Sequence, residues 1–111
     1  MIRRMQEGTL LRIFIGENER HEGRPLAEWI VRRAMDEGLA GATVLRGLQG
    51  YGLSHHLHTT RVLRLSEDLP LVVEIIDEEE KVKGFLPLLH DAVAEGLVTL
   101  EKVRFLLHRR D

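Results

Sequence analysis

The chain has 111 residues, 43% of them hydrophobic and 31% charged, so we expect residues 1–111 to form one folded domain. The formal net charge of -2 argues against a general nucleic-acid binder, because such proteins usually carry a basic excess. The absence of cysteine excludes disulfides, thiolate metal sites and cysteine nucleophiles. The apolar run near the start is short and contains Arg12, so we expect no signal peptide or membrane span and a cytoplasmic protein.

The first half of the chain predicts a strand, a helix and a second strand. Residues 8–16 carry apolar side chains on two alternating faces, which indicates a strand. Residues 25–37 predict a helix, with Pro25 in its first turn and Gly38 as its stop signal. Its apolar positions are Leu26, Trp29, Ile30, Ala34 and Met35. Residues 42–48 are rich in β-branched and aliphatic side chains and predict the second strand.

The second half predicts a strand, a helix and a strand. Residues 69–77 alternate clearly, and Asp77 with Glu80 three positions later has the pattern of a helix capping box. The helix that follows repeats apolar residues at helical spacing, and we expect Pro87 to kink it or to restart it. Residues 98–107 predict the last strand.

This order is that of an α+β, ferredoxin-like βαββαβ fold, with a four-stranded antiparallel sheet and two helices on one face. The strands are apolar on both faces: Val73 and Ile75 point one way, while Val72 and Ile76 point the other. Two helices can cover only one face of the sheet. Because large bare apolar patches usually mark association surfaces, we expect an oligomer.

The segment RGLQGYGLSHHLHTT, residues 46–60, is longer than a hairpin between the second and third strands requires. Long loops in compact domains are often functional, and three glycines here mark close backbone approaches or bends. Backbone N–H groups together with Arg46, Arg61 or Lys102 could contact a phosphate, although no complete phosphate-loop motif is present. The alternative interpretation is a structural hairpin extension with glycine bends. Residues 61–66 alternate weakly and predict a strand extension that returns from the loop.

His55, His56 and His58 form a cluster in the same loop. Imidazole binds zinc, copper and nickel, so one hypothesis is a metal site; the other is a solvent-exposed or locally hydrogen-bonded histidine group. The chain contains neither GxSxG nor HExxH, so we do not expect an enzyme.

Several motifs agree in order and spacing with one family. They are GATVLRGLQGYG at 41–52, HT at 58–59, LSEDLPLVVEIID at 65–77, FLPLL at 85–89 and EGLVTLEKV at 95–103. Together they resemble the uncharacterised family catalogued as domain of unknown function one hundred and ninety, over nearly the whole chain. That family is similar to the PII signal-transduction proteins, in which trimers of ferredoxin-like subunits bind nucleotides between subunits and dock their long loop onto transporters and enzymes.

The resemblance implies a PII-like trimeric regulator that binds a small ligand, such as a nucleotide, at the loop base or docks on a membrane transporter. Members of the family are often encoded near fluoride channels, which implies such a channel as a partner. The residues implied for the ligand site are Arg46, Gly50, Tyr51, Gly52, His58 and Lys102. The chain departs from the PII pattern at residues 95–102, where a single glycine stands beside acidic residues.

Two other hypotheses remain from the sequence. A metal-binding trimer, similar to the copper-tolerance proteins that share this architecture, would use His55, His56 and His58. A structural oligomer without a ligand would leave the histidines and glycines without a role.

Overall fold

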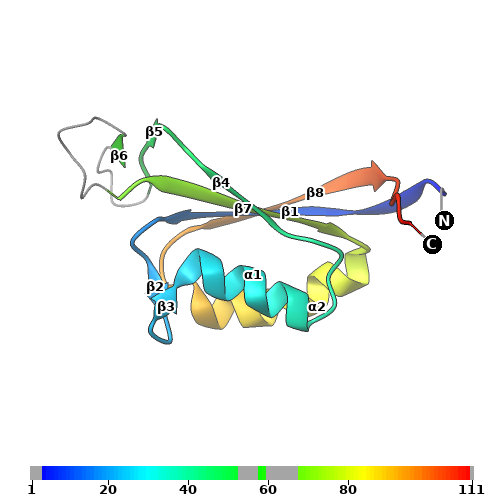
Figure 1. The fold of residues 1–111 in the computed structure, drawn as a ribbon, viewed down its shortest axis with the longest axis horizontal. Coiled ribbons are helices and arrows are strands. Elements are labelled where there is room, and N and C mark those ends of the chain that lie inside the picture. Colours follow the sequence, from blue (N-terminus) through cyan, green and yellow to red (C-terminus); the bar gives the residue numbers. More distant parts are fainter. Residues whose placement is uncertain (1–3, 53–57, 60–67, 111) are drawn as a thin grey trace.

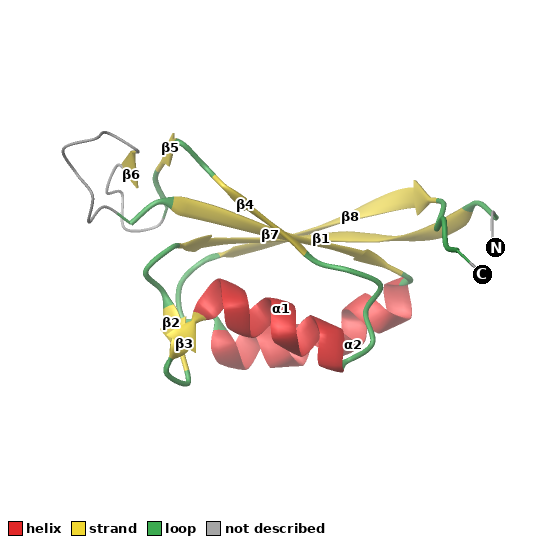
Figure 2. Cartoon of the chain, in the orientation of Figure 1, coloured by secondary structure: helices red, strands yellow, loops and turns green. Residues whose placement is uncertain are grey.

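The computed structural model describes residues 4–52, 58–59 and 68–110. A four-stranded antiparallel sheet has the strand order β4-β7-β1-β8, and both helices lie against one of its faces (Figures 1 and 2). The sheet strands are β1 (Gln6–Gly16), β4 (Thr43–Arg46), β7 (Pro70–Asp77) and β8 (Leu97–Phe105). The helices are α1 (Leu26–Asp36) and α2 (Glu79–Ala92). The predicted ferredoxin-like fold is confirmed.

Two short strand pairs lie outside the sheet. They are β2 (Arg20–His21) with β3 (Arg24–Pro25), and β5 (Gln49–Gly50) with β6 (His58–Thr59). The first pair is a hairpin that the sequence reading missed, and both of its turn residues, Glu22 and Gly23, have positive φ. Two positive φ values are the mark of a type I′ turn, which matches the twist of paired strands.

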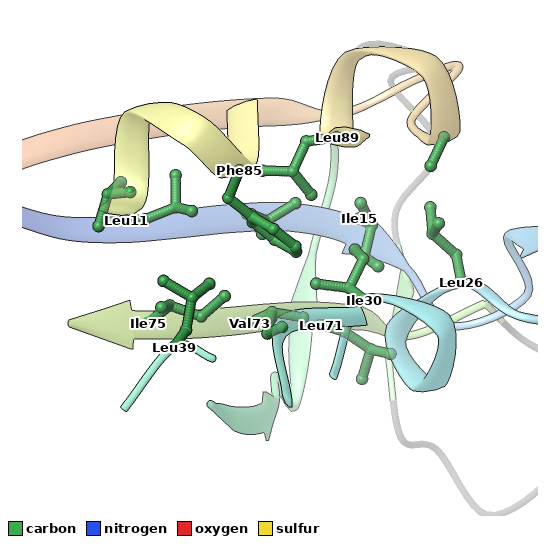
Figure 3. Close-up of a cluster of buried hydrophobic side chains, with 14 residues drawn as sticks. Leu11, Ile15, Leu26, Ile30, Leu39, Leu71, Val73, Ile75, Phe85 and Leu89 are labelled. Atoms are coloured by element: carbon green, nitrogen blue, oxygen red, sulfur yellow. The ribbon is translucent and has the colours of Figure 1, made fainter. Parts of the chain in front are cut away.

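The core lies between the sheet and the helices, because alternate residues of β1 and β7 point toward α1 and α2. Figure 3 shows Phe85 and Leu89 of α2 and Ile30 of α1 converging on the side chains of these two strands. The strand residues of this core are Leu11, Ile13, Ile15, Leu71, Val73 and Ile75. Burial of each such side chain stabilises the fold by about 1.5–3 kcal/mol.

The end of α1 follows the predicted stop signal. Gly38 has φ +80°, its N–H donates to the Met35 carbonyl, and the Leu39 N–H donates to the Ala34 carbonyl at 3.0 Å. These bonds form a Schellman motif, in which glycine takes the left-handed position at low cost. The start lies one residue later than predicted, because Pro25 is the N-cap and pairs with Arg20 in the hairpin.

Two predicted core positions of α1 behave differently. Trp29 is half-buried against the core, as expected, and its indole N–H donates to Glu22 at 3.0 Å. Met35 is 70% exposed, so its placement in the apolar stripe was wrong. Met35 lies nine residues after Leu26, and at 3.6 residues per turn it faces the opposite side of the helix.

The predicted capping box at Asp77 is also wrong. The N-cap of α2 is Glu78, without a side-chain capping bond, and Asp77 is the buried last residue of β7. Its carboxylate accepts the N–H of Glu78 at 2.7 Å and the N–H of Ala40 at 2.9 Å. Asp77 therefore ties the connection after α1 to the start of α2. The helix runs through Pro87 as one element, so the predicted restart does not occur.

The sheet face away from the helices carries a continuous apolar row across all four strands. Antiparallel register places Leu45 opposite Val72, Val72 opposite Phe14, and Phe14 opposite Leu97. We call these four residues the open-face row. Leu45 is 49% and Leu97 58% exposed, so the row forms the bare apolar face that the sequence predicted.

A polar group lies beside this row. Arg12 donates to Glu74 on one neighbouring strand at 2.8 Å and to Glu101 on the other at 2.9 Å. The hydrogen bond and charge of Glu74, followed by the charge of Glu101, raise the pKa of Arg12. The bridge holds β7, β1 and β8 together on the open face.

Candidate functional site

A cavity of about 700 Å³ lies where the long loop leaves the sheet. It is lined by residues 14–16, 19, 47, 49–52, 68, 70–72 and 95–97. These come from the end of β1, the chain after β4, the start of β7 and the turn before β8. We call this space the loop-base cavity. Its volume is within the range of small-molecule sites.

Apolar side chains form one wall of the loop-base cavity. Phe14, Val72 and Leu97 belong both to this wall and to the open-face row. The cavity therefore opens beside the bare sheet face. A second copy packed on that face would lie close to the cavity mouth.

Two glycines allow the walls to come together. A Cβ on Gly96 would lie 2.7 Å from the Phe14 carbonyl oxygen, and one on Gly47 would lie 2.8 Å from Cγ of Pro70. Real Cβ atoms essentially never approach so closely. The Gly47 N–H also donates to the Pro70 carbonyl at 2.7 Å, which anchors the start of the loop to β7. Glycine at 47 and 96 is therefore required by packing.

Three residues predicted for the ligand site lie together in the lining: Gly50, Tyr51 and Gly52. Tyr51 is 69% exposed, and a Cβ added at Gly52 would meet no atom within 4 Å. The backbone of His58 pairs with Gly50 through β6 and β5. The structure therefore brings the backbones of four predicted residues to one place.

Arg46 and Lys102 lie elsewhere. Arg46 is outside the lining, and its guanidinium forms an ion pair with Glu17. Lys102 stands opposite Thr9 on β8 and lines a separate cavity toward the end of that strand. One chain alone does not place Lys102 in the loop-base cavity.

His55, His56 and Arg61 lie outside the described residues, as does the strand extension predicted at 61–66. The metal hypothesis therefore stays a prediction. In the part of the chain that the structure describes, no group of three or more His, Cys, Asp or Glu side chains could hold a metal ion.

Three carboxylates of the loop-base cavity were not predicted from the sequence. Glu19, Asp68 and Glu95 line the loop-base cavity from three separate segments. Burial raises the pKa of Glu19 most, and repulsion from Glu95 and then Asp68 raises it further. The Asp68 carboxylate also accepts the N–H of Asn18 at 2.6 Å. No basic residue is among the described residues of the lining, so this cavity is acidic.

Neither helix, nor any other described helical segment, is long and apolar enough to cross a bilayer.

Solved structures with this fold come from a PII-like protein. The chain is similar to CPII from Thiomonas intermedia K12 bound to ADP and bicarbonate, with a TM-score of 0.61 and 19% identity over 92% of this chain and 91% of that one. A second structure, described as a nitrogen regulatory PII-like protein bound to ADP, AMP and bicarbonate, has a TM-score of 0.62 with the same identity and coverage. At this identity the likeness shows a PII-like fold.

Two sequence relatives are UPF0166 proteins. One from Aquifex aeolicus is 45% identical over 100 residues, covering 90% of this chain and 94% of that protein. One from Methanocaldococcus jannaschii is 32% identical over 97 residues, covering 86% and 89%. The model of the DUF190 family, described as Uncharacterized ACR, matches residues 8–105. The chain therefore belongs to the DUF190 family.

Proposed function

We propose that this protein is a non-catalytic, PII-like trimeric regulator that binds an adenine nucleotide in the loop-base cavity. The observation that carries the proposal is the cavity itself, about 700 Å³ in volume and lined by Gly50, Tyr51 and Gly52 where the long loop begins. A protein of the same fold has been solved with ADP, AMP and bicarbonate. The apolar wall suits a base, which such pockets usually bury against hydrophobic side chains.

The open-face row supports an assembly of subunits, and the trimeric order is proposed from the resemblance to PII proteins. Four apolar side chains, two of them about half exposed, form one stripe across the sheet, and a second copy is the occupant that would cover them. The row shares Phe14, Val72 and Leu97 with the cavity, so subunit packing and ligand binding would use the same wall.

The charge of the cavity restricts the ligand. Three carboxylates in the lining repel phosphate groups, and the repulsion grows with each added phosphate. Cations would have to come from Arg46 after release from Glu17, from His58 in the loop, or from Lys102 of a neighbouring subunit. We therefore expect AMP and ADP to bind more tightly than ATP.

The regulatory step would be a change in the loop. A ligand held against Gly50 and Tyr51 contacts the chain where the loop starts, so it would bias the conformation of residues 49–60. A docking partner, such as a membrane transporter or a fluoride channel, would recognise that conformation of the loop. A bound nucleotide would strengthen or weaken that docking.

The test is calorimetric titration of AMP, ADP and ATP into the wild-type protein and a Tyr51→Ala variant, with the mass in solution measured first. Tyr51→Ala should weaken AMP binding about tenfold, since stacking on an aromatic ring contributes about 1–3 kcal/mol. Met35→Ala, on the far side of α1, is the control and should bind AMP as the wild type does. A monomeric wild-type protein, or equal binding by Tyr51→Ala, would contradict the proposal.

A further inference from the structure

A second cavity, of about 550 Å³, lies toward the opposite end of the sheet from the loop base. β1 begins and β8 ends at this end, far from β5 and β6 (Figure 1). Its lining includes Glu7, Thr9, Glu79, Lys102 and Arg104. We call it the α2-start cavity, because Glu79 is the first residue of α2.

Strand register places four of these side chains on one face. Thr9 stands opposite Lys102, and Glu7 stands opposite Arg104. Directly opposed residues of an antiparallel pair share a face, and so do alternate residues along a strand. Thr9 lies on the same face as Leu11, whose side chain is in the core. All four side chains therefore lie on the helix side of the sheet, beside the start of α2.

The two cations of the α2-start cavity are not engaged in ion pairs within the described chain. Among the described residues, neither Lys102 nor Arg104 forms an ion pair. Glu79 is held by Lys83 at 3.3 Å, so Glu7 is the one carboxylate of this lining without an ion pair in the described chain. The cavity thus presents two unpaired cations against a single unpaired anion.

The hydroxyl-bearing residue Thr9 lines the α2-start cavity and adds a donor. Thr9 is only 7% exposed, yet its side chain makes no hydrogen bond within the described part of the chain. The nearby carboxylate of Asp77, opposite Thr9 on β7, already accepts the N–H groups of Ala40 and Glu78. The Arg33 Nε is the one buried side-chain atom without a partner among the described residues, so solvent reaches the Thr9 hydroxyl, which can donate to a bound group.

The first turn of α2 adds backbone donors. The helix has 14 residues, and no side chain caps its N-terminus in the described structure. The N–H groups of the first helical turn have no partner inside the helix, and the helix dipole favours a negative charge there. Lys102, Arg104 and the Thr9 hydroxyl are hydrogen-bond donors in the lining, and Glu79 is the residue of α2 that reaches it.

We propose that the α2-start cavity binds a phosphate-class oxyanion, either free or as the terminal group of a phosphate monoester. This site is separate from the nucleotide cavity, and it gives Lys102 a role within its own chain. Two cations and a hydroxyl match a tetrahedral oxyanion, which accepts several charge-assisted hydrogen bonds at once. Glu7, directly opposite Arg104, would compete with the anion for that guanidinium.

The experiment follows backbone amide resonances while inorganic phosphate or O-phosphoserine is added, with chloride at the same ionic strength as the blank. We expect saturable shifts at Glu79 and Glu80. The double variant K102Q/R104Q should weaken binding at least about tenfold, because bonds to a charged group are the stronger class. R109Q/R110Q removes the same charge from the tail and should change Kd less than about twofold. O-phosphoserine binding above that of phosphate would identify the monoester as the ligand form.

Thr9→Val keeps the shape of the side chain and removes the hydroxyl, whereas Thr9→Ser keeps the hydroxyl. Phosphate binding should weaken in the first variant and persist in the second, while AMP binding is unchanged in both. Equal weakening in the two double variants would show unspecific charge attraction and overturn the proposal. So would the absence of saturable shifts, or shifts confined to Gly50 and Tyr51. AMP binding by the Thr9 variants separates these results from nucleotide binding at the loop base.

Discussion

Asp77, at the end of β7, accepts a hydrogen bond from the backbone N–H of Ala40 at 2.9 Å, across 37 residues of sequence. The same carboxylate accepts the N–H of Glu78. One buried side chain therefore fixes the entry into β4 and the start of α2 together. The α2-start cavity depends on this position of the helix.

Asp77→Ala should lower the free energy of unfolding by about 2–4 kcal/mol, because two backbone N–H groups lose a charged acceptor. Asp77→Asn retains one acceptor oxygen and should cost less. The measurement is urea unfolding, with Asp36→Ala as an exposed control on α1. Equal stability of Asp77→Ala and the control would show that the two hydrogen bonds to the Asp77 carboxylate do not stabilise the fold.

Gly96→Ala should destabilise the protein by about 1–3 kcal/mol, because its Cβ would meet the Phe14 carbonyl, which belongs to the backbone and cannot rotate away. Gly52→Ala is the matched control. Its Cβ enters open space, and the unfolding midpoint should stay within error of the wild type. Thermal unfolding of the two variants side by side checks this, and similar losses in both would refute the packing argument.

Glu19→Gln should stabilise the protein at neutral pH by less than about 1 kcal/mol. The folded state raises the pKa of Glu19 above its ordinary value of 4.5, so the native chain holds the proton more tightly than the unfolded chain. Stability from this group is therefore present below 4.5 and is lost as pH rises through the raised pKa. The advantage of the amide should disappear in acid. Unfolding midpoints across a pH series test this, and an advantage independent of pH would contradict it.

Leu45→Glu should convert the assembly to monomers without unfolding the chain. Leu45 is 49% exposed in the single chain, so a carboxylate there is tolerated in a monomer and becomes buried only in an assembly. Met35→Glu, on the far side of α1, should leave the mass unchanged. Light scattering after size exclusion gives the mass directly. An unchanged mass for Leu45→Glu would show that the open-face row is not part of the subunit interface.

Periodicity in the sequence predicted the four sheet strands and both helices, because each has a long alternating or helical apolar pattern. The β2–β3 hairpin was missed since its turn is a Glu22-Gly23 pair in a polar stretch without apolar alternation. Asp77 was misread because a capping box is a local pattern, whereas its contact with Ala40 exists only after folding.

Some residues of the candidate site could likewise be predicted from the sequence, and others could not. Gly50, Tyr51 and Gly52 are adjacent in sequence, so their grouping at the loop base could be predicted. Glu19 and Asp68 come from distant segments that only the folded sheet brings together. No short sequence motif predicts that these two carboxylates line one cavity. Lys102 was grouped with Tyr51 by family resemblance, although the length of β8 separates them within one chain.

The most direct test of the account is calorimetric titration of AMP into the wild-type protein and into Leu45→Glu, each at a known mass. Leu45 lies outside the lining of the loop-base cavity, so its substitution changes assembly and leaves the cavity residues in place. We predict saturable binding to a wild-type trimer and at least about tenfold weaker binding to the monomer. Absence of saturable AMP or ADP binding to the wild-type trimer, or equal binding by the monomer, would contradict it.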